Sequence, residues 1–287
     1  MNNIFYFCCF ILIGCSSVPP IPKLITQTNH AKKKYTIHPG DVIKLKLPKA
    51  NFSAELRCEK KTSPFQEKED YSFAFYSESY FSKMKQVNCF YYFDSGKKVQ
   101  VASIQVHTKE FPKEQLRVDR KRVELSPKNL KRAIREKEIL NKIYKKQVNQ
   151  PLFDHSFRLP INSKVTSIYG TKRLFNKKKK GQHLGTDYRA KVGTPIKTAN
   201  RGKVVLARHL FFTGNTVIID HGMGIFTMYG HLSKFKVKEN MTVEKKNIIG
   251  LAGRTGRVTG AHLHWGVKVH GNWVDGNSLI IASLTHE

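Results

Sequence analysis

The first half of the chain alternates apolar and polar positions in the way half-buried β-strands do. Ile43, Leu45 and Leu47 are apolar, and lysines occupy the positions between them. Because successive side chains of a strand point to opposite faces, this alternation predicts a strand with one buried face. Similar segments occur at 54–58, 71–75, 87–93 and 99–101, and an Asp-Ser-Gly turn separates the last two. About five or six short strands in residues 35–108 predict a small, all-β, sandwich-like domain.

A helical period follows this strand-rich stretch. Ser126 is a suitable N-cap, and Pro127 suits the first helical position. Apolar residues then recur at helical spacing among many basic ones: Leu130, Ala133, Ile134, Leu140, Ile143 and Tyr144. The pattern predicts one amphipathic helix of about 20 residues, ending near Gln147. We interpret residues 109–150 as a linker whose helix packs on one domain; attachment of the helix to a membrane surface is the alternative.

Residues 151–287 return to strand-like segments separated by glycine-containing turns. The segments are 165–169, 204–207, 216–220, 225–229 and 263–269. No helix is signalled in this part of the chain, so a β-rich domain is expected. The stretch from 262 to 269 reads His-Leu-His-Trp-Gly-Val-Lys-Val. A period of two places its apolar residues on one face and His262, His264 and Lys268 on the other.

These histidines belong to a possible metal site. Two imidazoles and a carboxylate, from His183, His264 and Asp187, can be three protein ligands of a catalytic zinc, with the fourth position left for water. His183 and Asp187 are four residues apart and therefore fall on one side of an extended chain, while Gly185 between them allows the backbone to turn. His262 then stands beside that water, where a general base is needed. The alternative is a set of surface histidines on an edge strand.

The same residues lie within a broader resemblance. From about Phe157 to Leu284 the chain resembles the LytM/lysostaphin-type zinc metallopeptidases, enzymes that cut peptides of bacterial peptidoglycan. The matching segments are His183-Leu-Gly-Thr-Asp187, Gly193-Thr-Pro195, Gly214–Gly222, Tyr229-Gly-His-Leu232 and Thr259–His264. One departure is Ala261, where the family commonly has proline; it affects the stiffness of a turn and no catalytic role.

The resemblance implies a fold and a set of roles. The fold is a compact antiparallel β domain, residues 151–287, with a groove that holds one Zn²⁺ per chain. His183, Asp187 and His264 bind the metal, and His262 is the general base. His231 corresponds to the family's second catalytic histidine, which orients the water or stabilises the oxyanion.

The implied activity is that of a zinc metallo-endopeptidase acting on peptidoglycan cross-links. A D,D-endopeptidase is the first expectation, and an enzyme that cuts glycine bridges is the second. The alternative is a catalytically inactive LytM-like module that binds the cell wall and activates amidases. Such modules typically lack one or more metal-site residues, whereas all five positions here hold the expected residue types.

The charge of the chain changes the list of partners. Lys and Arg outnumber Asp and Glu by 51 to 21, for a formal net charge of +30. Such a balance suggests nucleic acid or an anionic surface. No nucleic-acid motif accompanies it, so we expect no nucleic-acid partner. Peptidoglycan or lipid headgroups remain as the expected anionic partners of a monomeric protein, and a charge that serves solubility alone is the alternative.

The first residues predict export. The apolar stretch from Ile4 to Ile13 is too short to span a bilayer and suits the core of a secretory signal. It ends in Leu12-Ile-Gly-Cys15, which resembles the lipobox of bacterial lipoproteins and implies lipidation of Cys15. We interpret residues 1–15 as a signal peptide and 16–34 as a tether. Ser16 implies sorting to the outer membrane of a Gram-negative bacterium, facing the periplasm; a short uncleaved anchor is the alternative.

Two cysteines remain for a disulfide. Cys58 and Cys89 each lie on the apolar side of a predicted strand. Outside the cytoplasm such a pair can oxidise. A buried Cys58–Cys89 disulfide is therefore expected, with two unpaired buried thiols as the alternative.

Overall fold

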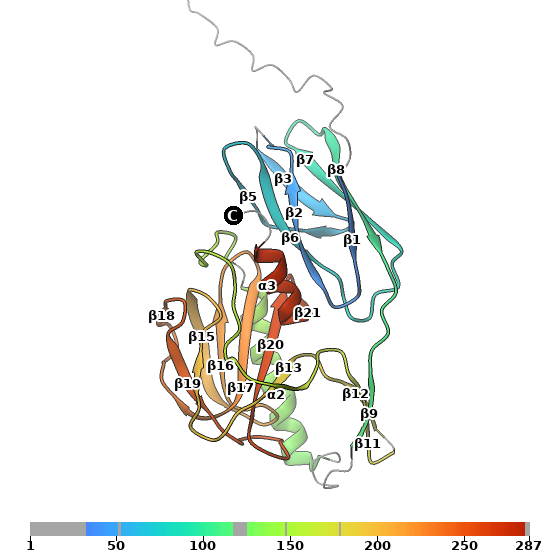
Figure 1. The fold of residues 1–287 in the computed structure, drawn as a ribbon. Coiled ribbons are helices and arrows are strands. Elements are labelled where there is room, and N and C mark those ends of the chain that lie inside the picture. The colour runs from blue at the N-terminus through green and yellow to red at the C-terminus, as the bar shows by residue number, and fades with distance from the viewer. Residues whose placement is uncertain (1–32, 51–52, 117–124, 147, 178, 285–287) are drawn as a thin grey trace, which may run out of the picture. The chain divides into compact units, whose positions relative to one another are not determined.

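A computed structural model describes residues 33–50, 53–116, 125–146, 148–177 and 179–284 of the chain (Figure 1). These residues belong to one compact unit, Lys32–Glu287. The predicted signal peptide, Cys15 and nearly all of the predicted tether lie outside the described residues. Within the described part of the chain, no helix has the length and apolar character needed to cross a membrane.

Two sheets form the N-terminal part. The first orders its strands β1 (Lys33–Ile37), β8 (Lys98–Val106), β7 (Gln86–Phe93), β3 (Ala54–Cys58) and β4 (Lys61–Thr62). The second is β2 (Val42–Leu47), β6 (Ser72–Ser77) and β5 (Phe65–Glu67). Both sheets contribute to one core, for example through Leu45 from β2 and Leu56 from β3. The alternation of apolar residues predicted this burial, because each strand turns one face toward the other sheet.

Cys58 and Cys89 are directly opposite each other on the antiparallel strands β3 and β7. The structure joins them by a disulfide, and both residues are buried. The pairing follows from the shared inward phase of the two strands, since side chains opposite each other on adjacent strands point to the same face.

The C-terminal part is built on one ten-stranded sheet. Its main order is β10 (Val165–Ser167), β13 (Thr186–Arg189), β20 (His262–Val269), β17 (Ile225–Phe235), β16 (Gly214–Asp220), β15 (Gly202–Leu210) and β18 (Thr242–Val243). The strands β14 (Pro195–Lys197), β19 (Ile248–Ala252) and β21 (Asn272–Val274) pair at its sides. Neighbouring strands of this sheet are antiparallel. The all-β class predicted from the sequence is confirmed.

The phase predicted for β20 is also confirmed. Leu263, Trp265 and Val267 on its apolar face are fully buried in the core of the sheet. His262 and His264 lie on the other face and are only partly buried. The packed face holds the strand in place while the imidazoles remain accessible.

The predicted helix is present as α2 (Pro127–Lys145), and Ser126 caps it by accepting a hydrogen bond from the backbone N–H of Asn129. Only its C-terminal half packs, through Ile139, Leu140, Ile143 and Tyr144, on the sheet residues Leu206, Leu210, Ile218, Phe226 and Met228. The expectation that Leu130 and Ile134 share this buried stripe is wrong, because they are 49% and 50% exposed. The N-terminal half of the helix contacts Phe211 through the polar residues Arg132 and Glu136, and its apolar positions Leu130 and Ile134 face solvent.

A second helix, α3 (Gly276–Leu284), contradicts the expectation that residues 151–287 contain none. Its sequence, Gly-Asn-Ser-Leu-Ile-Ile-Ala-Ser-Leu, is a short apolar run without a polar face, and such runs do not distinguish strand from helix. Asp275 begins the helix, since its carboxylate accepts a hydrogen bond from the backbone N–H of Asn277.

A small fourth sheet joins the two parts of the chain. It orders β12 (Lys179–Gln182), β11 (Lys172–Phe175) and β9 (Lys113–Leu116). β9 runs parallel to β11 and comes from the stretch that the sequence suggested was linker (Figure 1). Phe111, just before β9, packs so closely on Gly170 that a Cβ added there would lie 2.1 Å from its ring.

The N-terminal strands also form hydrogen bonds with β20 and α3 of the C-terminal part. The Ser77 hydroxyl donates to the carbonyl of Val269 at 2.8 Å, and the backbone N–H of Val42 donates to the Ser278 hydroxyl at 3.0 Å. Phe73 and Phe75 of β6 lie in the same core cluster as Trp265. The two parts therefore share apolar packing as well as hydrogen bonds.

Candidate metal centre and active site

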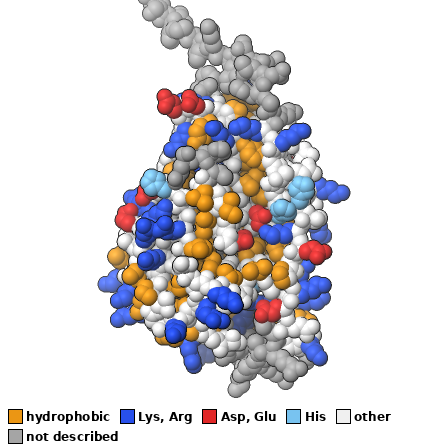
Figure 2. All heavy atoms as spheres, viewed as in Figure 1, with side chains coloured by type: hydrophobic (Ala, Val, Ile, Leu, Met, Phe, Trp, Pro, Cys, Tyr) orange, Lys and Arg blue, Asp and Glu red, His pale blue; other side chains and the backbone are white. Residues whose placement is uncertain are grey.

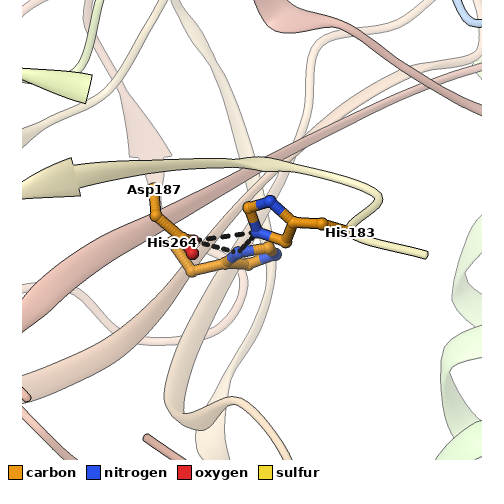
Figure 3. Close-up of side chains that lie close together, drawn as sticks. All are labelled: His183, Asp187 and His264. Atoms are coloured by element: carbon orange, nitrogen blue, oxygen red, sulfur yellow. Dashed lines mark hydrogen bonds and ion pairs between the residues drawn. The ribbon is translucent and has the colours of Figure 1, made fainter. Parts of the chain in front are cut away.

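Three side-chain atoms of metal-binding type meet beside β13 and β20 (Figure 3). Asp187 Oδ1 is 3.0 Å from His183 Nε2 and 2.8 Å from His264 Nδ1, and the two nitrogens are 3.2 Å apart. A tetrahedral zinc with nitrogen and oxygen ligands at about 2.0–2.2 Å holds its ligand atoms roughly 3.3–3.6 Å apart. A small outward movement would therefore accommodate the ion, so the three residues fit zinc.

Strand register brings the three residues together. β13 pairs with β20, and Asp187 is directly opposite His264. His183 approaches from the segment just before β13, and its ring lies 5.1 Å from the ring of His264, centroid to centroid. Among the described residues, these three are the group whose ligand-type atoms converge in this way.

Gly185 has a different role from the one expected. Its φ is not in the left-handed region, so the backbone there makes no turn that only glycine permits. A Cβ at this position would instead lie 2.5 Å from Cε1 of His264. Glycine is therefore required because the backbone passes against the imidazole of His264.

Polar neighbours hold two of the three residues. His183 Nδ1 is 3.1 Å from the carbonyl oxygen of Ile168, and donation of its N–H there leaves Nε2 with a lone pair facing Asp187. Asp187 Oδ2 accepts a hydrogen bond from Nη2 of Arg173 at 3.3 Å. Burial would raise the pKa of Asp187, but the close contacts of its carboxylate with the His183 and His264 imidazoles outweigh burial and hold the pKa of Asp187 below its usual range. The carboxylate is therefore ionised. Sequence reasoning missed Arg173 because it belongs to no recognisable motif.

His231 and His262 face the same site without joining the cluster. Their ring centroids are 4.8 Å apart, and His262 Nε2 is 3.8 Å from Asp187 Oδ1. In each ring Nδ1 faces a backbone carbonyl oxygen, that of Thr255 at 2.8 Å from His231 and that of Gly260 at 3.0 Å from His262. When Nδ1–H donates to that carbonyl, Nε2 is an acceptor. Both rings are thus arranged to accept a hydrogen bond or a proton.

The backbone of His231 is strained. Its φ is 62°, in the left-handed region that non-glycine residues seldom adopt, and its N–H donates to the carbonyl of Thr213 at 2.7 Å. Burial, the largest cause, and the neighbouring His264 and His262 together lower the pKa of His231 to about 3. The ring is therefore neutral at pH 7, and a neutral ring with Nδ1–H donated elsewhere can hold a water but cannot donate to an oxyanion.

A groove of about 470 Å³ opens over these residues. Besides the four histidines and Asp187 of the site, its walls include Glu114, Arg173, Phe175, Arg189, Phe212 and Arg257. The guanidinium of Arg257 lies over the ring of Phe212, 4.5 Å from its centroid. The groove can therefore admit an extended peptide, and its walls are basic as well as aromatic.

Part of the chain matches a known protein family. Residues 181–276, which include all five candidate residues, match peptidase family M23. The chain contains an M23 peptidase domain. The matched residues include most of the groove and most of the ten-stranded sheet, whereas the groove residues Glu114, Thr166, Ser167, Arg173 and Phe175 lie outside them.

Two relatives illustrate the likeness. Over 121 residues the chain is 42% identical to the peptidoglycan DD-endopeptidase ShyA of Vibrio cholerae. This alignment covers 41% of this chain and 28% of ShyA. Over 138 residues it is 34% identical to the DD-carboxypeptidase/endopeptidase Mpg of Neisseria meningitidis, or 48% of this chain and 30% of Mpg. The alignment therefore spans less than a third of either relative.

The structural likeness extends beyond the M23 domain. A solved chain described as a peptidase M23 from Pseudomonas aeruginosa superposes with a TM-score of 0.68 at 26% identity. The superposition covers 85% of this chain and 95% of that one. The arrangement of the N-terminal strands with the M23 domain is thus shared with another protein.

Proposed function

We propose that this protein is a zinc metallo-endopeptidase that hydrolyses peptide cross-links of bacterial peptidoglycan, acting as a D,D-endopeptidase. The observation that carries the proposal is the convergence of His183 Nε2, Asp187 Oδ1 and His264 Nδ1 beside two further histidines. The DD-endopeptidase activity in the names of the relatives supports the choice of substrate.

Each residue has a distinct task in this proposal. His183, Asp187 and His264 would hold one Zn²⁺ per chain, and the chemistry that such an ion would supply is Lewis-acid polarisation of the scissile carbonyl and a lowered pKa of water, to about 7. His262 accepts the proton of the attacking water at Nε2, as a general base. His231 accepts a second hydrogen bond from this water and so orients it. Because its Nδ1–H is donated to Thr255, we assign it water positioning in preference to stabilisation of the oxyanion.

The amidase-activating module is the less favoured function. A protein that only binds the wall needs neither a complete donor set nor two imidazoles that face it. Here the residues are present and their unused ring nitrogens are tied to carbonyl oxygens of Ile168, Thr255 and Gly260. Such support orients catalytic and metal-binding rings, and it favours catalysis.

The test is digestion of purified peptidoglycan with the full-length protein, followed by mass spectrometry of the released muropeptides and a parallel zinc assay. We expect stoichiometric zinc and conversion of cross-linked dimers to monomers. His264→Ala and Asp187→Ala should lose most of the zinc and the activity, because three protein ligands become two. Removal of a terminal D-alanine without loss of dimers would instead indicate a carboxypeptidase. Full zinc in either variant would contradict the ligand assignment.

We further propose that Cys15 is lipidated and that the monomeric protein is anchored in the outer membrane, facing the periplasm. The lipobox-like Leu12-Ile-Gly-Cys15 and the net charge of +30 support this placement. Lys and Arg side chains are spread over the face seen in Figure 2, with few acidic ones among them, which suits contact with an anionic wall. Cys15→Ala should move the protein from the membrane fraction to the soluble or precursor fraction; unchanged fractionation would contradict the anchor.

A further inference from the structure

Arg173 connects the candidate metal centre to the N-terminal part of the chain. Its Nη2 donates to Asp187 Oδ2 at 3.3 Å and to the Ser167 hydroxyl at 2.9 Å, while its Nε donates to Glu114 Oε2 at 3.3 Å. The side chains of Arg173 and Asp187 are only 20% and 11% exposed. One partly buried guanidinium thus bridges two carboxylates.

The two oxygens of Asp187 are used differently. Oδ1 lies within hydrogen-bond distance of both His183 and His264, and Oδ2 is held by Arg173. Charge-assisted hydrogen bonds of this kind fix the plane of a carboxylate. Ser167, which Arg173 also contacts, has its hydroxyl 3.2 Å from His183 Nδ1. Arg173 therefore supports two of the three candidate ligands from the side away from the cluster.

Glu114 reaches Arg173 through the small fourth sheet, β12-β11-β9. The two residues are register partners on the parallel strands β9 and β11. The backbone N–H of Lys172 donates to the carbonyl of Pro112 at 2.8 Å, and Phe111 packs on Gly170. β9 follows directly on the N-terminal strands, so that part of the chain contributes a carboxylate to the surroundings of the centre.

We propose that Arg173 is a positioning residue that reserves Oδ2 of Asp187, so that only Oδ1 is offered to the metal, and that Glu114 holds Arg173 in this orientation. The inference rests on the proposed metal site and deepens it. Because arginine presents its donors in a rigid planar fork, Nε on Glu114 sets the direction of Nη2 toward Asp187. The metal affinity of the M23 domain then depends on a residue contributed by a strand outside that domain.

The test measures zinc affinity by competition with a chromogenic chelator, using the full-length protein. Arg173→Gln should weaken zinc binding about 10–100-fold, the usual effect of losing an outer-shell partner. Arg173→Lys should recover only part of this loss, since a point charge cannot bridge both carboxylates. Glu114→Gln should weaken binding by at most about fivefold, as expected of a partly exposed ion pair.

A double variant separates action through Arg173 from an independent effect. If Glu114 acts through Arg173, Glu114→Gln changes nothing further in the Arg173→Gln background. Arg208→Gln is the matched control, because Arg208 pairs with Glu239 at the exposed surface of β15 and should leave zinc affinity unchanged. Circular dichroism and thermal melts establish that each variant is folded.

The visible spectrum of the cobalt(II)-loaded protein reports the ligation of Asp187 directly. If Arg173→Gln frees Oδ2 to join the metal, the coordination number rises and the d–d bands lose intensity relative to the wild type. If both folded Arg173 variants kept the zinc affinity of the wild type, with an unchanged cobalt spectrum, the positioning role of Arg173 would be overturned. The proposed endopeptidase function would be unaffected by that result. Additive effects in the double variant would overturn the role of Glu114.

Failure of the endopeptidase proposal can be distinguished from failure of the positioning role of Arg173. A wild-type protein that binds zinc and cleaves no peptidoglycan refutes the endopeptidase proposal, while the affinities of the Arg173 variants still decide the positioning role. A wild-type protein that binds no metal overturns both.

Discussion

Asp187 and His264 face each other across two adjacent strands although 77 residues separate them in the chain. Residues directly opposite on antiparallel strands point to the same face of the sheet. One pairing, β13 with β20, therefore delivers a carboxylate and an imidazole to the same face. His262 is opposite Arg189, one pleat repeat or roughly 6.6 Å further along the strand. This displacement explains why His262 lies beside the cluster and not in it.

The roles of His262 and His231 can be separated from metal binding. His262→Ala should keep zinc and folding while lowering turnover by roughly 10²–10⁴-fold, the usual worth of a positioned acid–base group. His231→Ala should also keep zinc and lose activity, because the attacking water is no longer oriented. Both muropeptide release and zinc content are measured for each variant. Loss of zinc from His262→Ala would make it a ligand, and full activity in both variants would refute the assigned roles.

Gly185→Ala should damage the metal site without unfolding the protein. The added Cβ would lie 2.5 Å from Cε1 of His264 and 2.9 Å from the carbonyl oxygen of Trp265, so the imidazole must shift. We expect weaker zinc binding at nearly unchanged thermal stability, measured by chelator competition and calorimetry. Gly260→Ala is the control, since a Cβ there meets nothing within 4 Å and should leave affinity unchanged. Equal affinities in the two variants would contradict the steric role of Gly185.

His221 should make the fold sensitive to acid. It is fully buried, bonded to the carbonyl of Arg201 and the hydroxyl of Thr227, and burial lowers its pKa to about 4. Because the pKa of His221 in the folded protein lies below the unfolded value of about 6.5, the neutral ring stabilises the fold fully above pH 6.5. This stabilisation is lost as the pH falls toward 4.

From this shift, the free energy of unfolding should fall by about 2 kcal/mol between pH 7 and pH 5 on account of His221. Urea unfolding at both pH values measures it. His221→Asn should be less stable at pH 7 and lose less on acidification. Asp220, whose pKa burial raises to about 6, acts in the opposite direction, so only the difference between variant and wild type isolates His221. Parallel pH dependence in the two proteins would refute this origin.

The Cys58–Cys89 disulfide should stabilise the N-terminal sheets. The cysteines are 31 residues apart, and closing a loop of this length is worth roughly 4 kcal/mol in the chain-entropy model. The double variant Cys58→Ala, Cys89→Ala should unfold at lower urea concentration than the oxidised protein. Wild type in reducing agent is the comparison that keeps both side chains. Mass spectrometry that finds two free thiols in protein purified from the periplasm would show that the bond does not form there.

Local patterns in the sequence predicted a good part of this molecule. The faces of β20, the apolar phase of Cys58 and Cys89, and the start of α2 at Ser126 follow from side-chain periods and capping, which depend on neighbouring residues alone. His231 came from the resemblance to a family and not from any periodicity. α3 was missed because a short apolar run is compatible with either secondary structure.

What the sequence by itself determined is the chemistry available: two imidazoles on one face of β20, and His183 and Asp187 four residues apart. The tertiary structure alone decided which atoms meet. Only the register of β13 with β20 places Asp187 opposite His264, and only the pairing of β9 with β11 brings Glu114 to Arg173. Register between distant strands is set by the packing of whole sheets, and a shift by one residue would turn these side chains to the other face.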